Sequence, residues 1–406
     1  MPRLLEKIII SEKRRIAMVA SGGGLKAHYF HMGVGIRLAR EGFQFNGGVL
    51  ETPRTELIPP HELGTKTIDM FVGSSGGALF SMGVALGHSP EDMYNLFRDP
   101  KQLKKVGLAQ GIGHYIQFNR KTITQAAKCM LRILATKQLH PEALSFMSPI
   151  SLEPLEKRLH RFLETEDFRH VAADLFVVST PLNLRNRIVY SRRPFEEEPR
   201  LVYRNDANIS SAVTASCALQ FLAPICVEHK NGDKIDQVDG ETRKTLSYKI
   251  ASSNGADLVF VSYTHVPYEF DKDVGSIKKY GLIRTVVQSV YLLIEEKILA
   301  SQELTQQKNT TYDLVMGEFE QILTDLPTEH RAALIDHRDR MVARLVKELD
   351  IKRGVDYIFI RPESDDHDFY FDWHLGMSTD YVEKMVRKGY EAADRELRKF
   401  DFKFLK

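Results

Sequence analysis

Over roughly its first 265 residues, the chain alternates between short apolar runs and longer segments whose apolar residues recur at helical spacing. Residues 16–20 form one such run and predict a buried strand, and residues 27–41 after it predict a helix. Residues 67–72 and 78–86 repeat this order of strand and helix. The alternation is typical of α/β folds with a mostly parallel central sheet.

Later segments extend the sheet and then give way to helices. Apolar runs predict further strands at 175–179, 187–190 and 256–264, and a helix at 209–219. Beyond them, helical patterns cover residues 275–300, 312–324, 329–349 and 379–400, with one short strand at 356–360. We therefore expect an α/β domain over residues 1–270 and a mainly helical C-terminal region over residues 271–406 packed on it.

Composition and charge exclude several classes of protein. With 43% hydrophobic and 27% charged residues, the 406-residue chain has the composition of a folded globular protein, and its net charge of +2 is too small for nucleic-acid binding through bulk electrostatics. Three cysteines without CxxC spacing suit a reducing compartment. The apolar run 8–10 is too short for a signal peptide, and the sequence has no stretch of about 18 apolar residues. We expect a cytoplasmic protein whose membrane contacts are peripheral.

Residues 73–77 match the motif Gly-x-Ser-x-Gly, with Ser75 at its centre. The motif lies between a predicted strand and a predicted helix, where the chain must turn sharply. The glycines leave room for that turn, which presents the serine hydroxyl at the edge of the sheet beside a helix N-terminus. Ser75 is therefore the candidate nucleophile, although an ordinary glycine-serine turn would have the same letters.

A second glycine-rich turn, residues 21–24, joins the first predicted strand to the first predicted helix. The backbone N–H groups of Gly23 and Gly24 can converge there on an anion, either a phosphate or the oxyanion of an acyl intermediate. The turn lacks the spacing of nucleotide-binding motifs, because Lys26 is followed by Ala27 where a serine or threonine would bind magnesium. The sequence therefore favours an oxyanion site.

Asp239 follows a short strand-like run and precedes Gly240. An Asp-Gly pair alone is a common turn. However, a glycine-rich loop, then Gly-x-Ser-x-Gly, then Asp-Gly is an order that resembles the patatin-like phospholipase family, which is related to the cytosolic phospholipase A group. Residues 209–218 also resemble the family's helix before its aspartate, so the resemblance covers about residues 16–265.

This resemblance implies a three-layer patatin-like fold and a lipid acyl hydrolase that cleaves carboxylic esters of phospholipids or other glycerolipids. It implies Ser75 as nucleophile and Asp239 as the base that activates it, with no cofactor and no metal. Lys26 stands where the family commonly has arginine and is implied in binding the substrate's phosphate. The oxyanion hole is implied at Gly22, Gly23 and Gly24.

Two positions depart from the family's pattern. Lys26 is a point charge that cannot form the bidentate contacts of arginine with a phosphate. Glu241 stands where a second glycine usually follows Asp-Gly, which puts the backbone geometry after Asp239 in doubt. A free aspartate has a pKa of about 3.9, so Asp239 is an effective base only in a buried, water-poor site.

Two alternatives stay open. A Ser-Asp-His triad of the α/β-hydrolase type would use His265, which follows Asp239 in the required chain order. A non-catalytic lipid- or nucleotide-binding protein on the same scaffold would explain Lys26 and Glu241. Metal catalysis has little support, because no His-Glu-x-x-His motif occurs and residues 365–368 are typical of a solvated acidic loop.

Residues 100–141 contain eight basic residues and no acidic residue, in a chain of nearly balanced charge. Within this segment, apolar residues at helical spacing predict an amphipathic helix over residues 121–137. One interpretation is a helix packed on the core with a solvated basic face. The other is a helix near the active site that docks on anionic lipid and serves as a lid.

Overall fold

The computed structural model describes residues 6–118, 120–136, 150–219 and 224–403. The chain divides into one unit made of Met1–Ser276 and Tyr357–Lys406, and a second unit made of Ile277–Asp356. This division differs from the predicted boundary at residue 270, because the last fifty residues return to the first unit. All the candidate site residues belong to that first unit.

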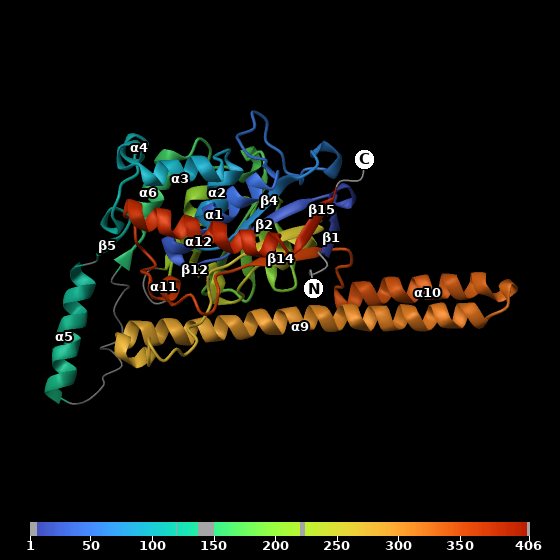
Figure 1. Cartoon of the computed structure of the whole chain (residues 1–406). Helices are drawn as coiled ribbons and strands as arrows, with labels where there is room; N and C mark the ends of the chain where they lie inside the picture. The colour runs from blue at the N-terminus through green and yellow to red at the C-terminus, as the bar shows by residue number, and fades with distance from the viewer. Residues whose placement is uncertain (1–5, 119, 137–149, 220–223, 404–406) are drawn as a thin grey trace. The chain divides into compact units, whose positions relative to one another are not determined.

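Four parallel strands form the centre of the sheet, among them β2 (Ile16–Ala20) and β4 (Thr67–Gly73) in Figure 1. Their pairing brings the two glycine-rich turns to one edge of the sheet. In spatial order the four strands are β13 (Leu258–Ser262), β2, β4 and β7 (Asp174–Pro181). Each runs parallel to its neighbour. Ser262 pairs with Ala20, and Ala20 pairs with Gly73, so the carboxyl ends of three strands are level. The mostly parallel sheet confirms the predicted α/β class.

Further strands extend this sheet on both sides. They are β3 (Gln44–Phe45), β8 (Arg187–Tyr190), β9 (Glu196–Glu198), β10 (Leu201–Arg204), β11 (Ile225–Glu228), β12 (Lys234–Asp239) and β14 (Asp356–Ile360).

The strand β12 decides where the candidate aspartate lies. It runs antiparallel to β7, with Asp239 opposite Ser179. Ser179 lies two residues beyond Val177, and Val177 pairs with Gly73 at the end of β4. Because Ser75 is likewise two residues beyond Gly73, the antiparallel strand carries Asp239 to the level of Ser75.

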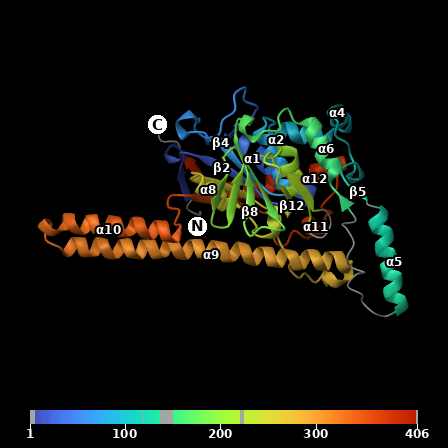
Figure 2. The same cartoon turned by 180° about the vertical axis from the view of Figure 1, so that it is seen from behind.

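Helices cover both faces of the sheet (Figures 1 and 2). The four helices α1 (Gly24–Arg40), α2 (Gly76–Ala85), α7 (Ile209–Ser216) and α12 (Thr379–Leu397) share one hydrophobic core with side chains such as Met18 and Phe71 of the strands. The short helix α8 (Tyr248–Ser253) covers the other face. Two helical layers around a sheet confirm the predicted three-layer architecture.

The C-terminal helix α12 is held against α1 by two glycines. A Cβ atom on Gly33 would lie 1.9 Å from the carbonyl oxygen of Val386, and one on Gly389 would lie 1.9 Å from that of Phe30. Any side chain at either position would therefore push the helices apart. This close packing explains why residues beyond Tyr357 belong to the α/β unit.

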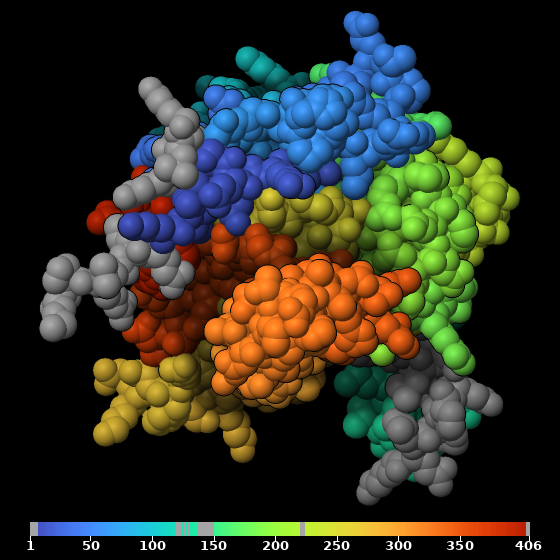
Figure 3. Space-filling view, turned by 90° about the vertical axis from the view of Figure 1, so that its right-hand side faces the viewer, coloured from blue at the N-terminus to red at the C-terminus, as the bar shows by residue number. Residues whose placement is uncertain are grey.

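The remaining elements of the first unit surround this core. The ends of the described chain meet where β1 (Glu6–Ile9) pairs in parallel with β15 (Phe400–Lys403), and blue and red segments lie close together in Figure 3. The other helices are α3 (Pro90–Arg98), α4 (Pro100–Lys105), α5 (Arg120–Thr136), α6 (Glu153–Phe162) and α11 (His367–Phe371). Short 3-10 helices occur at Ile10–Glu12, Pro60–Glu62, Ile112–His114, Phe168–His170 and Gly240–Thr242.

The helix α5 confirms the helix predicted in the basic segment, although Lys137 at its predicted end lies outside the described residues. Its neighbours in the sequence, β5 (Gln117–Phe118) and β6 (Ile150–Ser151), pair with each other. The large apolar side chains of α5 are exposed, with 68% of Met130, 67% of Leu131 and 71% of Leu134 accessible to solvent. The interpretation of α5 as a helix packed on the core is therefore wrong.

The second unit consists mainly of two long helices packed together, α9 (Gly281–Asp325) and α10 (Thr328–Leu349), preceded by a 3-10 turn at Ile277–Tyr280. The sequence predicted two helices in place of α9, at 275–300 and 312–324. The intervening residues 301–311 are polar except for Leu304, which hid the helical pattern, but they contain neither glycine nor proline and so continue the helix. In the described part of the chain, no helix combines the length and apolar character needed to cross a bilayer.

Candidate active site

Ser75 occupies a strained turn between β4 and α2. Its backbone angles are φ 53° and ψ −127°, a conformation that residues other than glycine rarely adopt. The next residue has to be glycine, because a Cβ atom on Gly76 would lie 2.0 Å from the carbonyl oxygen of Gly24. The N–H of Ser75 donates to the hydroxyl of Ser216 at 2.9 Å. The turn thus has the geometry of a nucleophile elbow.

Asp239 ends β12 and is 6% exposed. Its Oδ1 atom accepts a hydrogen bond from the N–H of Glu241 at 2.8 Å, and the Ser75 side chain also bonds to its carboxylate. Burial raises the pKa of Asp239 to about 7, with a further contribution from the neighbouring charge of Glu241. The structure therefore brings Ser75 and Asp239 together and gives the aspartate the basicity that a free carboxylate lacks.

The glycine loop meets the nucleophile at the N-terminus of α1. Gly23 and Gly24 have φ angles of 128° and 68°, and α1 begins at Gly24. An α-helix leaves the N–H groups of its first turn without partners inside the helix, and its dipole adds positive potential there. A Cβ atom on Gly22 would lie 3.5 Å from the Ser75 hydroxyl oxygen, which shows how closely the loop approaches the nucleophile.

Gly22 differs from the other two glycines in its hydrogen bonding. Its N–H donates to the Oε1 atom of Glu241 at 3.1 Å. Glu241 is buried, and the same oxygen accepts a hydrogen bond from the hydroxyl of Ser74. Of the three predicted oxyanion donors, Gly22 is therefore already engaged by a carboxylate.

Lys26 lies elsewhere than the sequence implied. The residue is fully buried, and its Nζ atom donates to the carbonyl oxygen of Phe369 at 3.1 Å and lies 4.5 Å from the centre of the Phe369 ring. It does not line the pocket beside Ser75. Its contacts join α1 to the C-terminal segment and are not those expected of a residue that binds substrate phosphate.

His265, the candidate third member of a triad, is also buried. Burial lowers its pKa to about 3, and the nearby charges of Lys26 and His31 lower it further. The groups that act on Asp239 are instead Glu241 and Ser75. Since His265 and Asp239 have different electrostatic neighbours, the geometry does not favour a Ser-Asp-His triad.

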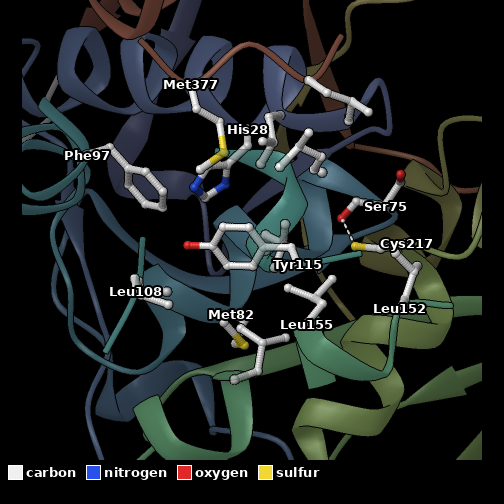
Figure 4. A pocket seen from close by; sticks show the side chains of 18 of the residues that line it. His28, Ser75, Met82, Phe97, Leu108, Tyr115, Leu152, Leu155, Cys217 and Met377 are labelled. Atoms are coloured by element: carbon white, nitrogen blue, oxygen red, sulfur yellow. Dashed lines mark hydrogen bonds between the residues drawn. The ribbon is translucent and has the colours of Figure 1, made fainter. Parts of the chain in front are cut away.

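An apolar pocket opens beside Ser75 (Figure 4). Ser75 and Cys217 lie at one side of it, and Phe97 and Leu108 lie at the other. Segments on both sides of α5 in the sequence contribute to the lining, through residues 108–116 and 150–162. Most lining side chains are aliphatic or aromatic, among them Leu25, Leu79, Met82, Leu155, Phe162 and Met377. Such a pocket suits a hydrocarbon chain.

His28 is a polar residue of this pocket that the sequence analysis missed. It is 3% exposed, and its Nδ1 atom has no hydrogen-bond partner among the described residues. Burial lowers the pKa of His28 to about 3, which keeps the ring neutral. The sequence could have indicated that His28 lines the pocket. Leu25 and His28 are three residues apart, so they share one face of α1.

Potential metal ligands do not gather into a group of three or more anywhere in the described part of the chain. Within the described residues, a strained serine thus lies between a parallel strand and a helix, beside a buried acid. A family model described as Patatin-like phospholipase matches residues 18–250, more than half of the chain. The chain belongs to the patatin-like phospholipase family, a family of lipid acyl hydrolases. A search of curated proteins found no match.

Proposed function

We propose that this protein cleaves carboxylic ester bonds of phospholipids or other glycerolipids, with Ser75 as nucleophile and Asp239 as general base. The observation that carries the proposal is the position of Ser75, which lies between the buried carboxylate of Asp239 and an apolar pocket. Neither a cofactor nor a metal is needed for this dyad.

The reaction follows from the geometry in two steps. Asp239 takes the proton of Ser75 while the serine oxygen attacks the ester carbonyl carbon, and the carbonyl oxygen becomes an oxyanion. The N–H groups of Gly23 and Gly24 stabilise that oxyanion, aided by the dipoles of α1 and α2. The alcohol then leaves with the proton held by Asp239. In the second step Asp239 activates water, which cleaves the acyl-enzyme and releases the fatty acid.

The pocket determines which part of the substrate binds where. Each buried methylene contributes about 0.8 kcal/mol, so an acyl chain gains most of its binding energy in the apolar lining formed by residues such as Leu79 and Leu155. The ester carbonyl then lies at Ser75, and the head group extends out of the pocket.

The helix α5 supports a peripheral membrane association. Its exposed apolar side chains accompany Lys128 and Arg132, which are also exposed. Apolar burial together with attraction of about 1 kcal/mol per basic residue would dock the helix on anionic lipid. Since both pocket-lining segments flank α5 in the sequence, docking there would place the pocket near the lipid. The free Cys217 and Cys226 suit a reducing compartment and hence a cytoplasmic location.

A non-catalytic lipid-binding role is the second candidate, and it is favoured by one observation. The Glu241 carboxylate accepts a hydrogen bond from the N–H of Gly22, and the family resemblance implies that this N–H would donate to the oxyanion instead. A protein that only binds lipid would have no need of a free oxyanion hole.

A comparison of the wild type with Ser75→Ala distinguishes the hydrolase from the non-catalytic lipid-binding protein. We expect the wild type to react with a fluorophosphonate probe and to release fatty acid from a panel of phospholipids and neutral glycerides, as measured by mass spectrometry. Ser75→Ala should lose both activities while its circular dichroism spectrum stays unchanged, because only a hydroxyl is removed. Activity near the wild-type level in Ser75→Ala would contradict the nucleophile assignment, and an unreactive wild type would favour the binding role.

A further inference from the structure

Glu241 links three segments of the active site through one buried carboxyl group. Its Oε1 atom accepts hydrogen bonds from the N–H of Gly22, at 3.1 Å, and from the hydroxyl of Ser74. Its Oε2 atom accepts one from the N–H of Leu246 at 3.4 Å, and its own N–H donates to Asp239 at 2.8 Å. The glycine loop, the nucleophile turn and the aspartate therefore all contact this residue.

The packing around this carboxyl group leaves little freedom. A Cβ atom on Gly22 would lie 3.0 Å from Cγ of Glu241 and 3.0 Å from Cβ of Ser75. Gly22 is thus enclosed between the glutamate side chain and the nucleophile. If Glu241 were shortened, the loop would gain room to move, and the N–H of Gly22 and the hydroxyl of Ser74 would lose their buried acceptor.

We propose that Glu241 is a positioning residue for ester cleavage. Through its hydrogen bonds with Gly22 and Ser74, it fixes the position of the glycine loop relative to the nucleophile turn. The inference rests on the proposed function, because the relative position of the glycine loop and the nucleophile turn matters only if an acyl group reacts at Ser75. It also reassigns Gly22, whose N–H belongs to this framework and not to the oxyanion hole. Two donors, Gly23 and Gly24, then remain for the oxyanion.

The charge of Glu241 gives the same residue a second, measurable effect. Its charged neighbours are Asp239 and the buried Arg187, and Arg187 also faces Arg243. Asp239 in turn is surrounded by Glu241, Ser75 and Cys217. Burial raises the pKa of Glu241 above its ordinary value, and the hydrogen bonds to its carboxylate and the guanidinium of Arg187 oppose that rise. Burial raises the pKa of Asp239 most, and the negative charge of an ionised Glu241 raises it further. Because a higher pKa means a stronger base, Glu241 also strengthens Asp239 as a base.

The test compares Glu241→Gln and Glu241→Ala in the full-length protein, with kcat and KM for a short-chain p-nitrophenyl ester measured from pH 5 to 9. In the wild type, activity should rise as the pH increases through about 7, where Asp239 ionises. Glu241→Ala should lower kcat about 10-fold to 100-fold with little change in KM, because misplaced groups slow the chemistry more than binding. Glu241→Gln should recover most of that kcat, because its amide oxygen can accept the same two hydrogen bonds.

Both variants should also shift the acid limb of the profile to lower pH, since each removes the negative charge beside Asp239. Asp236→Asn, which neutralises an exposed acid on the same strand, is the matched control and should leave kcat and the acid limb unchanged. Wild-type kcat and an unshifted acid limb in both Glu241 variants would overturn the inference. If Glu241→Ala does not fold, an unshifted limb in Glu241→Gln alone would overturn it.

Ser75→Ala, assayed in parallel, separates this inference from the proposed function. If Ser75→Ala keeps activity, the proposed function fails and the inference fails with it. If Ser75→Ala is inactive and both Glu241 variants behave as wild type, the function stands and the inference alone fails.

Discussion

Replacing Asp239 with asparagine should stabilise the folded protein at alkaline pH and remove its activity. The pKa of this carboxyl rises from an ordinary 3.8 to about 7 in the folded state, mainly because the group is buried. Between these two values the folded state binds the proton more tightly than the unfolded chain does, so the stability contributed by Asp239 falls as the pH rises. At about 1.36 kcal/mol for each tenfold change in proton affinity, the ionised carboxylate costs the fold up to about 4 kcal/mol above pH 7.

Asparagine has nearly the same shape, and its Oδ1 atom can still accept from the N–H of Glu241. The variant and the wild type should therefore be about equally stable near pH 4, and the variant should become more stable as the pH rises, by up to about 4 kcal/mol at pH 8. At the same pH its esterase activity should fall about 100-fold to 10,000-fold, the usual effect of losing a general base.

Urea unfolding followed by tryptophan fluorescence is a suitable assay, because the only tryptophan of the sequence, Trp373, belongs to the α/β unit. Asp236→Asn on the same strand serves as the control for a change at an exposed acid. A stability difference between Asp239→Asn and wild type that is constant from pH 4 to 8, or that favours the wild type at pH 8, would refute the argument that burial makes Asp239 basic.

Two further predictions concern His265 and α5. His265→Ala should keep esterase activity within a few fold of wild type, because the groups around His265 are not those around Asp239; loss as complete as that of Ser75→Ala would restore the triad. Lys128→Glu combined with Arg132→Glu should weaken binding to anionic vesicles at low salt, whereas Arg344→Glu combined with Lys347→Glu, on α10, should not. If both double variants bind as wild type does and salt has no effect, α5 is not the docking surface.

The sequence predicted the turns of the candidate site well because turns impose local constraints. Only glycine tolerates the approach of Gly76 to the carbonyl oxygen of Gly24, so the Gly-x-Ser-x-Gly pattern indicates the elbow directly. The role predicted for Lys26 depended on where its side chain points, which the spacing of residues in the sequence does not show. Lys26 follows the glycine loop, but its side chain points toward Phe369. Glu241 was visible as a departure from the family pattern, yet its contact with Gly22 joins residues more than two hundred positions apart.

The fold was predictable to the extent that each element has its own hydrophobic pattern. The strand at residues 16–20 was predicted without error because all five side chains are buried, whereas α9 was divided in two because its middle is polar. The sequence pattern also placed α12 in a C-terminal helical region, since nothing local shows that Gly33 and Gly389 allow it to pack on α1. Long-range packing of that kind decides domain boundaries and leaves little trace in a single sequence.

Burial explains both why the ionised Asp239 destabilises the fold and why Asp239 can act as a base. A carboxylate that is paired with arginine, as Asp69 is with Arg15, stays in the interior because of its partner. Asp239 instead lies beside Glu241 and Ser75. Burial and the neighbouring charge of Glu241 both raise the pKa of Asp239, so the site favours its protonated form. A serine hydroxyl is a poor acid, and only a base with raised proton affinity can take its proton at neutral pH. The unfavourable environment of Asp239 is therefore what a Ser-Asp dyad requires, and removing either the burial or the neighbouring charge would weaken the base.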